Sequence, residues 1–119
     1  MKTHKDLEVW KRSVDLVTFI YDVTRDFPKE EIYGLTNQIR RAAVSIPSNI
    51  SEGAGRNHKK EFIQFLYVSL GSVAELETQF IIANNLNIST KESLIKIQNE
   101  LTAIRKMISG LIINLKSRK

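Results

Sequence analysis

The chain of 119 residues contains no cysteine, only two histidines, two prolines and five glycines. The lack of cysteine excludes disulfides and thiolate metal sites and is typical of a reducing compartment. No stretch approaches 18 uninterrupted apolar residues, and the charged N-terminus is not followed by the apolar core of a signal peptide. We therefore expect one cytoplasmic domain over residues 1–119, with no membrane partner.

Groups suited to catalysis are scarce. Neither His4 nor His58 has a neighbour at metal-ligand spacing, and the Glu-x-x-His pattern of di-iron helical bundles is absent. Ser45 and Ser48 have no histidine close in sequence, although folding could bring His58 toward them. We expect no enzymatic activity, no metal and no cofactor. A pocket that joins His58 to Ser45, Ser48 or a carboxylate would favour an enzyme instead.

Positive charge is concentrated near the C-terminus. The net charge is +5, and residues 1–85 hold equal numbers of basic and acidic side chains, so the whole excess lies in residues 86–119. No acidic residue follows Glu100. Cations at the end of a helix can simply complement its dipole. An acid-free basic segment is also typical of proteins that bind phosphates.

Apolar residues recur at alternating steps of three and four in four segments, which predicts four helices. We expect them over residues 6–27, from residue 32 or 35 to residue 53, over residues 58–85 and from residue 89 onward. Asn57 is the expected N-cap of the third helix, and Ser89 with Glu92 forms a capping box for the fourth. Glycine in the left-handed conformation is expected to end the second helix. With short connections, the pattern predicts an all-α, antiparallel up-down four-helix bundle.

Two of the predicted helices carry more apolar surface than a lone bundle can cover. In the first helix we expect one stripe to face the core (Leu7, Trp10, Val14, Val17, Tyr21, Thr24) and a second to remain (Val9, Leu16, Ile20, Val23, Phe27). The third helix likewise has a second stripe (Ile63, Tyr67, Leu70, Ala74, Ile81). Self-association is the simplest cover for such surplus. The alternative is irregular packing that hides it within one chain.

Proline and glycine inside the predicted helices give two further expectations. Pro47 removes a backbone donor and crowds the carbonyl four residues earlier, so we expect the second helix to be kinked at Pro47, near Ala43. Gly71 and Gly110 each cost about 1 kcal/mol relative to alanine in mid-helix. Close approach of the third and fourth helices would explain them, and chance is the alternative.

The residues that we expect to bind nucleic acid fall into three groups. The segment from Gly53 to Lys60 opens a helix and is basic, but it lacks the spacing of a nucleotide-binding P-loop. Arg40 and Arg41 are adjacent, and ion pairing with Glu52, Asp15, Asp22 or Glu75 is the alternative to phosphate binding for at least one of them. In order of preference, the candidates are Arg105, Lys106, Lys116, Arg118 and Lys119, then Arg56, Lys59 and Lys60, then Arg40 and Arg41.

Three stretches of the chain resemble a known family. These are Asp6 to Trp10 with Phe27 to Leu35, and the string Gln38-Ile-Arg-Arg-Ala-Ala-Val-Ser-Ile-Pro-Ser-Asn-Ile-Ser-Glu-Gly53. They are similar to the bacterial four-helix-bundle proteins encoded in 23S ribosomal RNA intervening sequences. The resemblance implies a ring-like homopentamer without established enzymatic activity. A relative, the accessory protein of diversity-generating retroelements, has the same bundle and binds nucleic acid and a reverse transcriptase.

These observations favour a non-enzymatic, oligomeric interaction protein that binds RNA or DNA through phosphate contacts, with little choice of sequence. The alternative is a structural or scaffold protein whose partner is another protein. A large exposed apolar patch on the assembled oligomer, with scattered basic residues, would favour that alternative.

Overall fold

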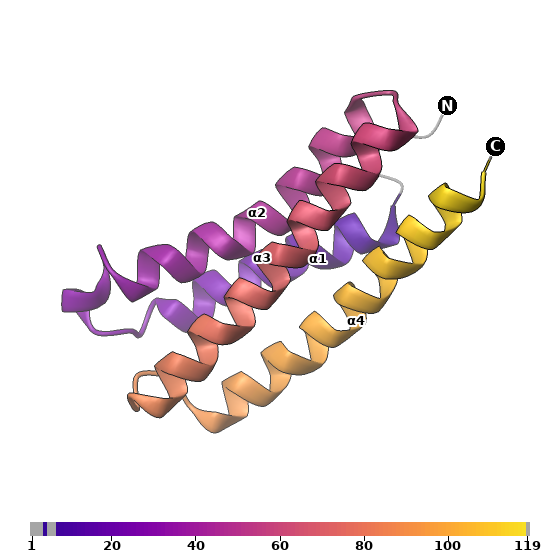
Figure 1. Ribbon diagram of the computed structural model, residues 1–119. Helices are drawn as coiled ribbons and strands as arrows, with labels where there is room; N and C mark the ends of the chain where they lie inside the picture. Colours follow the sequence, from indigo (N-terminus) through magenta and orange to yellow (C-terminus); the bar gives the residue numbers. More distant parts are fainter. Residues whose placement is uncertain (1–3, 5–6, 119) are drawn as a thin grey trace.

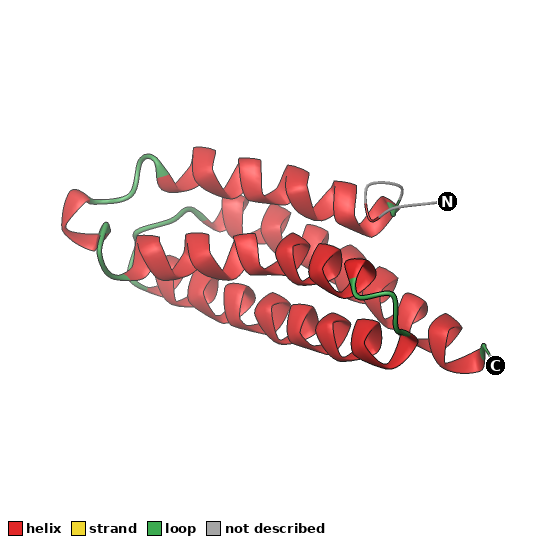
Figure 2. Ribbon diagram, turned by 90° about the horizontal axis from the view of Figure 1, so that it is seen from above, coloured by secondary structure: helices red, strands yellow, loops and turns green. Residues whose placement is uncertain are grey.

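The computed structural model describes residue 4 and residues 7–118, and this part of the chain folds into four α-helices without a strand (Figure 1). They are α1 (Glu8–Thr24), α2 (Leu35–Gly55), α3 (Lys59–Asn85) and α4 (Lys91–Ser117), with a short 3₁₀ helix at Lys29–Glu31. Neighbouring helices pack along their lengths, and α1 also contacts α4, which closes an elongated bundle of 49 × 22 × 19 Å (Figure 2). The predicted all-α four-helix fold is confirmed.

The core is built from one apolar face of each helix. On α2, α3 and α4 the buried residues recur at the predicted steps of three and four, with Ile39, Leu76 and Ile104 fully buried. On α1 the prediction was wrong, because the second stripe faces the core. Ile20 is completely buried, whereas Tyr21 is 40% exposed. The two stripes are similarly apolar, so periodicity alone could not tell which one faces inward.

Pro47 lies inside α2, is buried, and is followed by two further turns of helix. Pro47 has no N–H to donate to the carbonyl of Ala43. Next to the proline, the carbonyl of Ile46 accepts a hydrogen bond of 2.9 Å from the Ser69 hydroxyl of α3. This contact ties the proline-containing turn to α3. The kink expected at Pro47 stays a prediction.

The glycines act differently from the expectation. A methyl group on Gly53 would lie 2.7 Å from Cβ of Phe65, so this glycine allows α2 and α3 to approach closely. Gly71 and Gly110 have no neighbouring atom within 4 Å of such a methyl, which contradicts the expected approach of α3 and α4 there. The left-handed glycine expected at the end of α2 is wrong, since no described glycine has a positive φ. The left-handed residue that follows α2 is Asn57, at φ 62°.

The helix starts also differ from the expected caps. His58, not Asn57, occupies the N-cap position of α3, since Asn57 takes up the left-handed turn that joins α2 to α3. At the start of α4 the cap is Thr90, whose hydroxyl accepts a 3.1 Å hydrogen bond from the Ser93 amide. The N-cap therefore lies one residue after the expected Ser89, and the expected capping box with Glu92 is wrong, because Ser93 occupies the position that the box requires for a glutamate.

The third helix is long and apolar enough to cross a membrane, by length and composition only. Its apolar face is instead the centre of the bundle, where Leu66, Leu76 and Phe80 are completely buried. Its hydroxyl-bearing Ser69 and Ser72 are hydrogen-bonded to α2. These contacts are those of a core helix of a globular bundle.

An ion pair joins α1 to α4 at mid-length. Arg12 Nε donates to Glu100 Oε1 at 3.0 Å, and Nη2 donates to Oε2 at 3.1 Å, which is bidentate geometry. The hydrogen bond from Arg12 lowers the pKa of Glu100, and the same hydrogen bond raises the pKa of Arg12. Both side chains are substantially exposed, so the pair contributes only modestly to stability.

Replacing Glu100 by glutamine is expected to lower the free energy of unfolding slightly at pH 7. Because the folded-state pKa of Glu100 is depressed, the stabilisation is full above the ordinary glutamate pKa, about 4.3, and is lost as the pH falls through the lowered folded value. Urea denaturation of both proteins from pH 7 to pH 3 checks this. The two midpoints should converge at low pH, and a constant difference would contradict the linkage.

Candidate nucleic-acid interface

One end of the bundle carries the start of α1, the end of α2, the start of α3 and the end of α4 (Figure 1). The Lys59 amine donates a hydrogen bond to the carbonyl of Arg118, which joins the start of α3 to the C-terminal residues. Lys116 of α4 and Tyr67 of α3 lie beside each other, two turns further into the bundle from Lys60. We call Lys59, Lys60, Lys116 and Arg118 the basic end.

The cations at this end of the bundle differ in whether a carboxylate lies close to them. Arg56 lies 3.2 Å from Glu52 and 3.9 Å from Glu61 and packs over the Phe65 ring, so two carboxylates offset its charge. By contrast, among the described residues no carboxylate comes within 4.0 Å of the four cations of the basic end. All four are exposed. The basic end therefore presents net positive charge to solvent.

The sequence placed Lys116 and Arg118 in one candidate group and Lys59 and Lys60 in another, and the structure brings the two groups together through the contact of Lys59 with Arg118. It leaves Arg105 and Lys106 exposed near the middle of α4. Arg105 precedes Lys116 by eleven residues, so the two share a side of α4 at a separation of about 16 Å. Lys119 lies outside the described residues.

The two adjacent arginines of α2 have different surroundings. Arg40 Nε donates to Thr24 Oγ1 at 2.9 Å, and its guanidinium lies 4.5 Å from the centre of the Tyr21 ring. Arg40 is half-buried and fastens α2 to α1 through these two contacts. Arg41 is exposed and lines a polar hollow between α2 and α3 together with Glu75 and Gln79. In the described part of the chain, neither arginine forms the expected ion pair within 4.0 Å.

Ser45 takes part in a polar network between α2 and α3. Its hydroxyl accepts hydrogen bonds from Ser72 Oγ at 2.8 Å and from Asn49 Nδ2 at 2.9 Å. Ser72 follows His58 by fourteen residues of α3, so His58 lies about 20 Å away from this network. The structure therefore does not bring His58 to Ser45, and the serine hydroxyls bind the two helices to each other.

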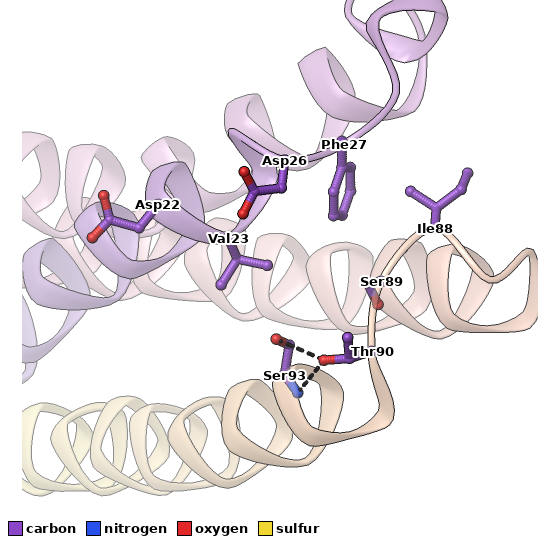
Figure 3. A pocket seen from close by; sticks show the side chains of 8 residues that line it. All are labelled: Asp22, Val23, Asp26, Phe27, Ile88, Ser89, Thr90 and Ser93. Atoms are coloured by element: carbon purple, nitrogen blue, oxygen red, sulfur yellow. Dashed lines mark hydrogen bonds between the residues drawn. The ribbon is translucent and has the colours of Figure 1, made fainter.

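The opposite end of the bundle carries a second hollow, between the end of α1 and the start of α4 (Figure 3). Asp22 and Asp26 border it on the α1 side, and the Thr90 cap with its bonds to Ser93 borders it on the α4 side. Among the described residues no three histidine, cysteine or acidic side chains are placed to hold a metal ion, here or elsewhere. The bundle is therefore basic at one end and has aspartates at the other.

Tyr67 is a residue next to the basic end that the sequence analysis did not include among the candidate site residues. It was assigned to a surplus apolar stripe of the third helix. In the structure its hydroxyl accepts a 3.0 Å hydrogen bond from the Lys116 amine. The two residues are 49 positions apart, so only the register of α3 against α4 reveals the pair.

Comparison with known proteins agrees with the fold. The family model of the 23S rRNA-intervening sequence protein matches residues 5–110, well past the segments that carry the sequence resemblance. A solved structure from Bacteroides thetaiotaomicron, a protein with unknown function from the S23 ribosomal protein family, is similar with a TM-score of 0.81 and 25% identity, over 87% of this chain and 94% of that one. No curated protein matches. Given the family match over most of its length, the chain belongs to the 23S rRNA-intervening sequence protein family.

Proposed function

We propose that this protein is a non-enzymatic homo-oligomer that binds RNA or DNA through phosphate contacts at its basic end. The observation that carries the proposal is the meeting of four cations from two helices, none within 4.0 Å of a carboxylate of the described residues. Lysine amines are compact, mobile charges that suit phosphate oxygens in varied geometries. Such contacts position a nucleic acid without reading its sequence.

Exposed apolar side chains support self-association. Val14 and Tyr21 of α1 and Val44 of α2 are each more than a third exposed, and Tyr21 and Val44 line one shallow hollow between the helices. Further exposed apolar residues lie on the other pair of helices: Ile81 and Ile82 near the end of α3 and Ile95 near the start of α4, with Ile113 about 27 Å further along α4. Exposed apolar residues on two different pairs of helices favour head-to-tail contacts, which form a ring where the rotation between copies closes. The ring-like homopentamer itself is proposed from the family resemblance.

Ring assembly would add the positive charge of the copies together. In a ring, the copies are related by rotation about one axis, and this rotation does not change how far along the axis any atom lies. The basic ends of all copies therefore lie at the same level along the ring axis. A nucleic acid that contacts several copies binds each further copy at a high effective concentration. The weak charge of one chain thus becomes a multivalent surface. We place this assembly in the cytoplasm, without a cofactor or a membrane.

Salt dependence of binding tests the phosphate contacts. We expect the logarithm of the association constant to fall linearly with the logarithm of salt concentration, in fluorescence anisotropy with a labelled RNA or DNA. Replacing Lys59, Lys60, Lys116 and Arg118 by alanine should weaken binding at least tenfold. The same change should reduce the slope by about 0.7 to 0.9 for each phosphate that is no longer neutralised by a cation.

The matched control removes four cations from the other end of the bundle, by alanine at Arg25, Lys29, Lys91 and Lys96. Its slope should stay close to that of the wild type. Equal losses in both variants would show that only net charge matters, which contradicts a defined interface. An intact oligomer that binds no nucleic acid at low salt would overturn the proposal and point to a protein partner.

A further inference from the structure

We infer that Tyr67 is a stacking platform for one base of a single-stranded nucleic acid, with the basic end holding the flanking phosphates. This inference rests on the proposed function and names the form of nucleic acid that the same site prefers. It starts from the one exposed tyrosine that the described structure places in hydrogen-bond contact with a cation of the basic end.

The ring of Tyr67 is available to a ligand. Tyr67 is 49% exposed, although its hydroxyl is bound by Lys116. The Lys116 amine lies 3.0 Å from that hydroxyl oxygen but 5.3 Å from the ring centre. These two distances place the amine beyond the hydroxyl end of the ring, not over its face. Lys116 therefore restrains the ring without covering the face on which a base would stack.

Cations lie on two sides of this ring. Lys60 precedes Tyr67 by seven residues, so both occupy the same side of α3, about 10 Å apart along the helix. Lys116 approaches from α4 at the hydroxyl end. The neighbouring carboxylate of Glu61 lies 3.9 Å from Arg56, and among the described residues it is not within 4.0 Å of either lysine. A strand running over Tyr67 thus meets a positive charge before and after the ring.

An aromatic ring between cations distinguishes single strands from duplexes. In a duplex both faces of each base are already stacked, and only phosphates are accessible to a flat protein surface. In a single strand a base can leave its neighbours and stack on an aromatic side chain. The stacking is tolerant of sequence, because every base has a π-face. The phosphate contacts of the basic end act on single strands and duplexes alike. Stacking on Tyr67 adds affinity for single strands only.

Two other exposed tyrosines lack this combination. Tyr21 is covered by the Arg40 guanidinium, 4.5 Å from its ring centre. Tyr33 is 94% exposed, but it precedes α2, about 30 Å along that helix from the basic end. Tyr33 therefore serves as a matched control for the removal of an exposed tyrosine.

The test measures binding of an unstructured 12-nucleotide RNA and of its duplex by fluorescence anisotropy. Tyr67→Leu should weaken single-strand binding by about fivefold to 150-fold, the range measured for one stacked base, and change duplex binding less than twofold. Tyr67→Phe keeps the ring and should retain most single-strand affinity. Tyr33→Leu should leave both affinities unchanged. Light scattering should give Tyr67→Leu the mass of the wild type.

The outcomes separate this inference from the proposed function. A wild type that binds neither RNA form at low salt overturns both. A wild type that binds both forms while Tyr67→Leu changes neither, or weakens both equally, overturns only the stacking role. Loss of the oligomer in Tyr67→Leu would assign the ring to an interface between copies and would also overturn it.

Discussion

The variant Val14→Glu/Val44→Glu should dissociate the oligomer and weaken nucleic-acid binding by about 10²-fold to 10⁴-fold, the usual size of the gain from multivalent binding. Val14 and Val44 are 36% and 39% exposed on α1 and α2, so glutamate fits each site without disturbing the core of one chain. In an interface, the same two carboxylates would be buried without partners, which is strongly unfavourable. Each basic end would then act alone.

Analytical ultracentrifugation and anisotropy of the same samples check this result. Asn85→Glu/Asn99→Glu is the control, since it adds the same charge at two exposed polar positions. The control should keep both the mass and most of the affinity. Dissociation without loss of affinity would show that the basic ends do not act together. An unchanged mass in Val14→Glu/Val44→Glu would exclude this face from the interface.

Gly53→Ala should lower the free energy of unfolding by about 1–3 kcal/mol, the usual cost of overpacking a tight contact. The new Cβ would lie 2.7 Å from Cβ of Phe65, 3.0 Å from Cδ1 of Phe62 and 3.3 Å from its Cα. Two of these atoms are fixed to the helix backbone, so rotation of a side chain cannot relieve the clash. The helices α2 and α3 must instead move apart next to the basic end.

Gly71→Ala and Gly110→Ala serve as controls for Gly53→Ala. Both glycines are exposed in mid-helix and have open space around the new methyl group, so alanine should stabilise each helix by up to about 1 kcal/mol. Thermal or urea denaturation of the three variants should therefore give opposite signs. A Gly53→Ala protein as stable as the wild type would contradict the close packing of α2 against α3.

The four helices could be predicted from the sequence because apolar residues recur regularly, at steps of three and four, over long segments. It could not choose the inward face of α1, since Ile20 and Tyr21 belong to stripes of similar apolarity. The sequence analysis also predicted a close helix contact at Gly71 and Gly110, whereas the structure has it at Gly53. Those details depend on which surfaces meet, and a single chain pattern does not contain that information.

The candidate site was predictable in its charges and not in its geometry. Lys59, Lys60, Lys116 and Arg118 stood out as cations, yet their meeting depends on how α3 lies against α4. Arg40 was expected in an ion pair or at a phosphate, and the structure holds it against Tyr21 and Thr24. Side-chain partners far apart in sequence follow only from the packed register of the helices.

Light scattering of the wild-type protein, alone and with a 12-nucleotide single-stranded RNA at low salt, tests the central claim most directly. We predict a particle of five times the 13.6 kDa of one chain, which gains the mass of bound RNA and loses it again as salt is raised. A particle of one chain that gains no mass with RNA would contradict the account.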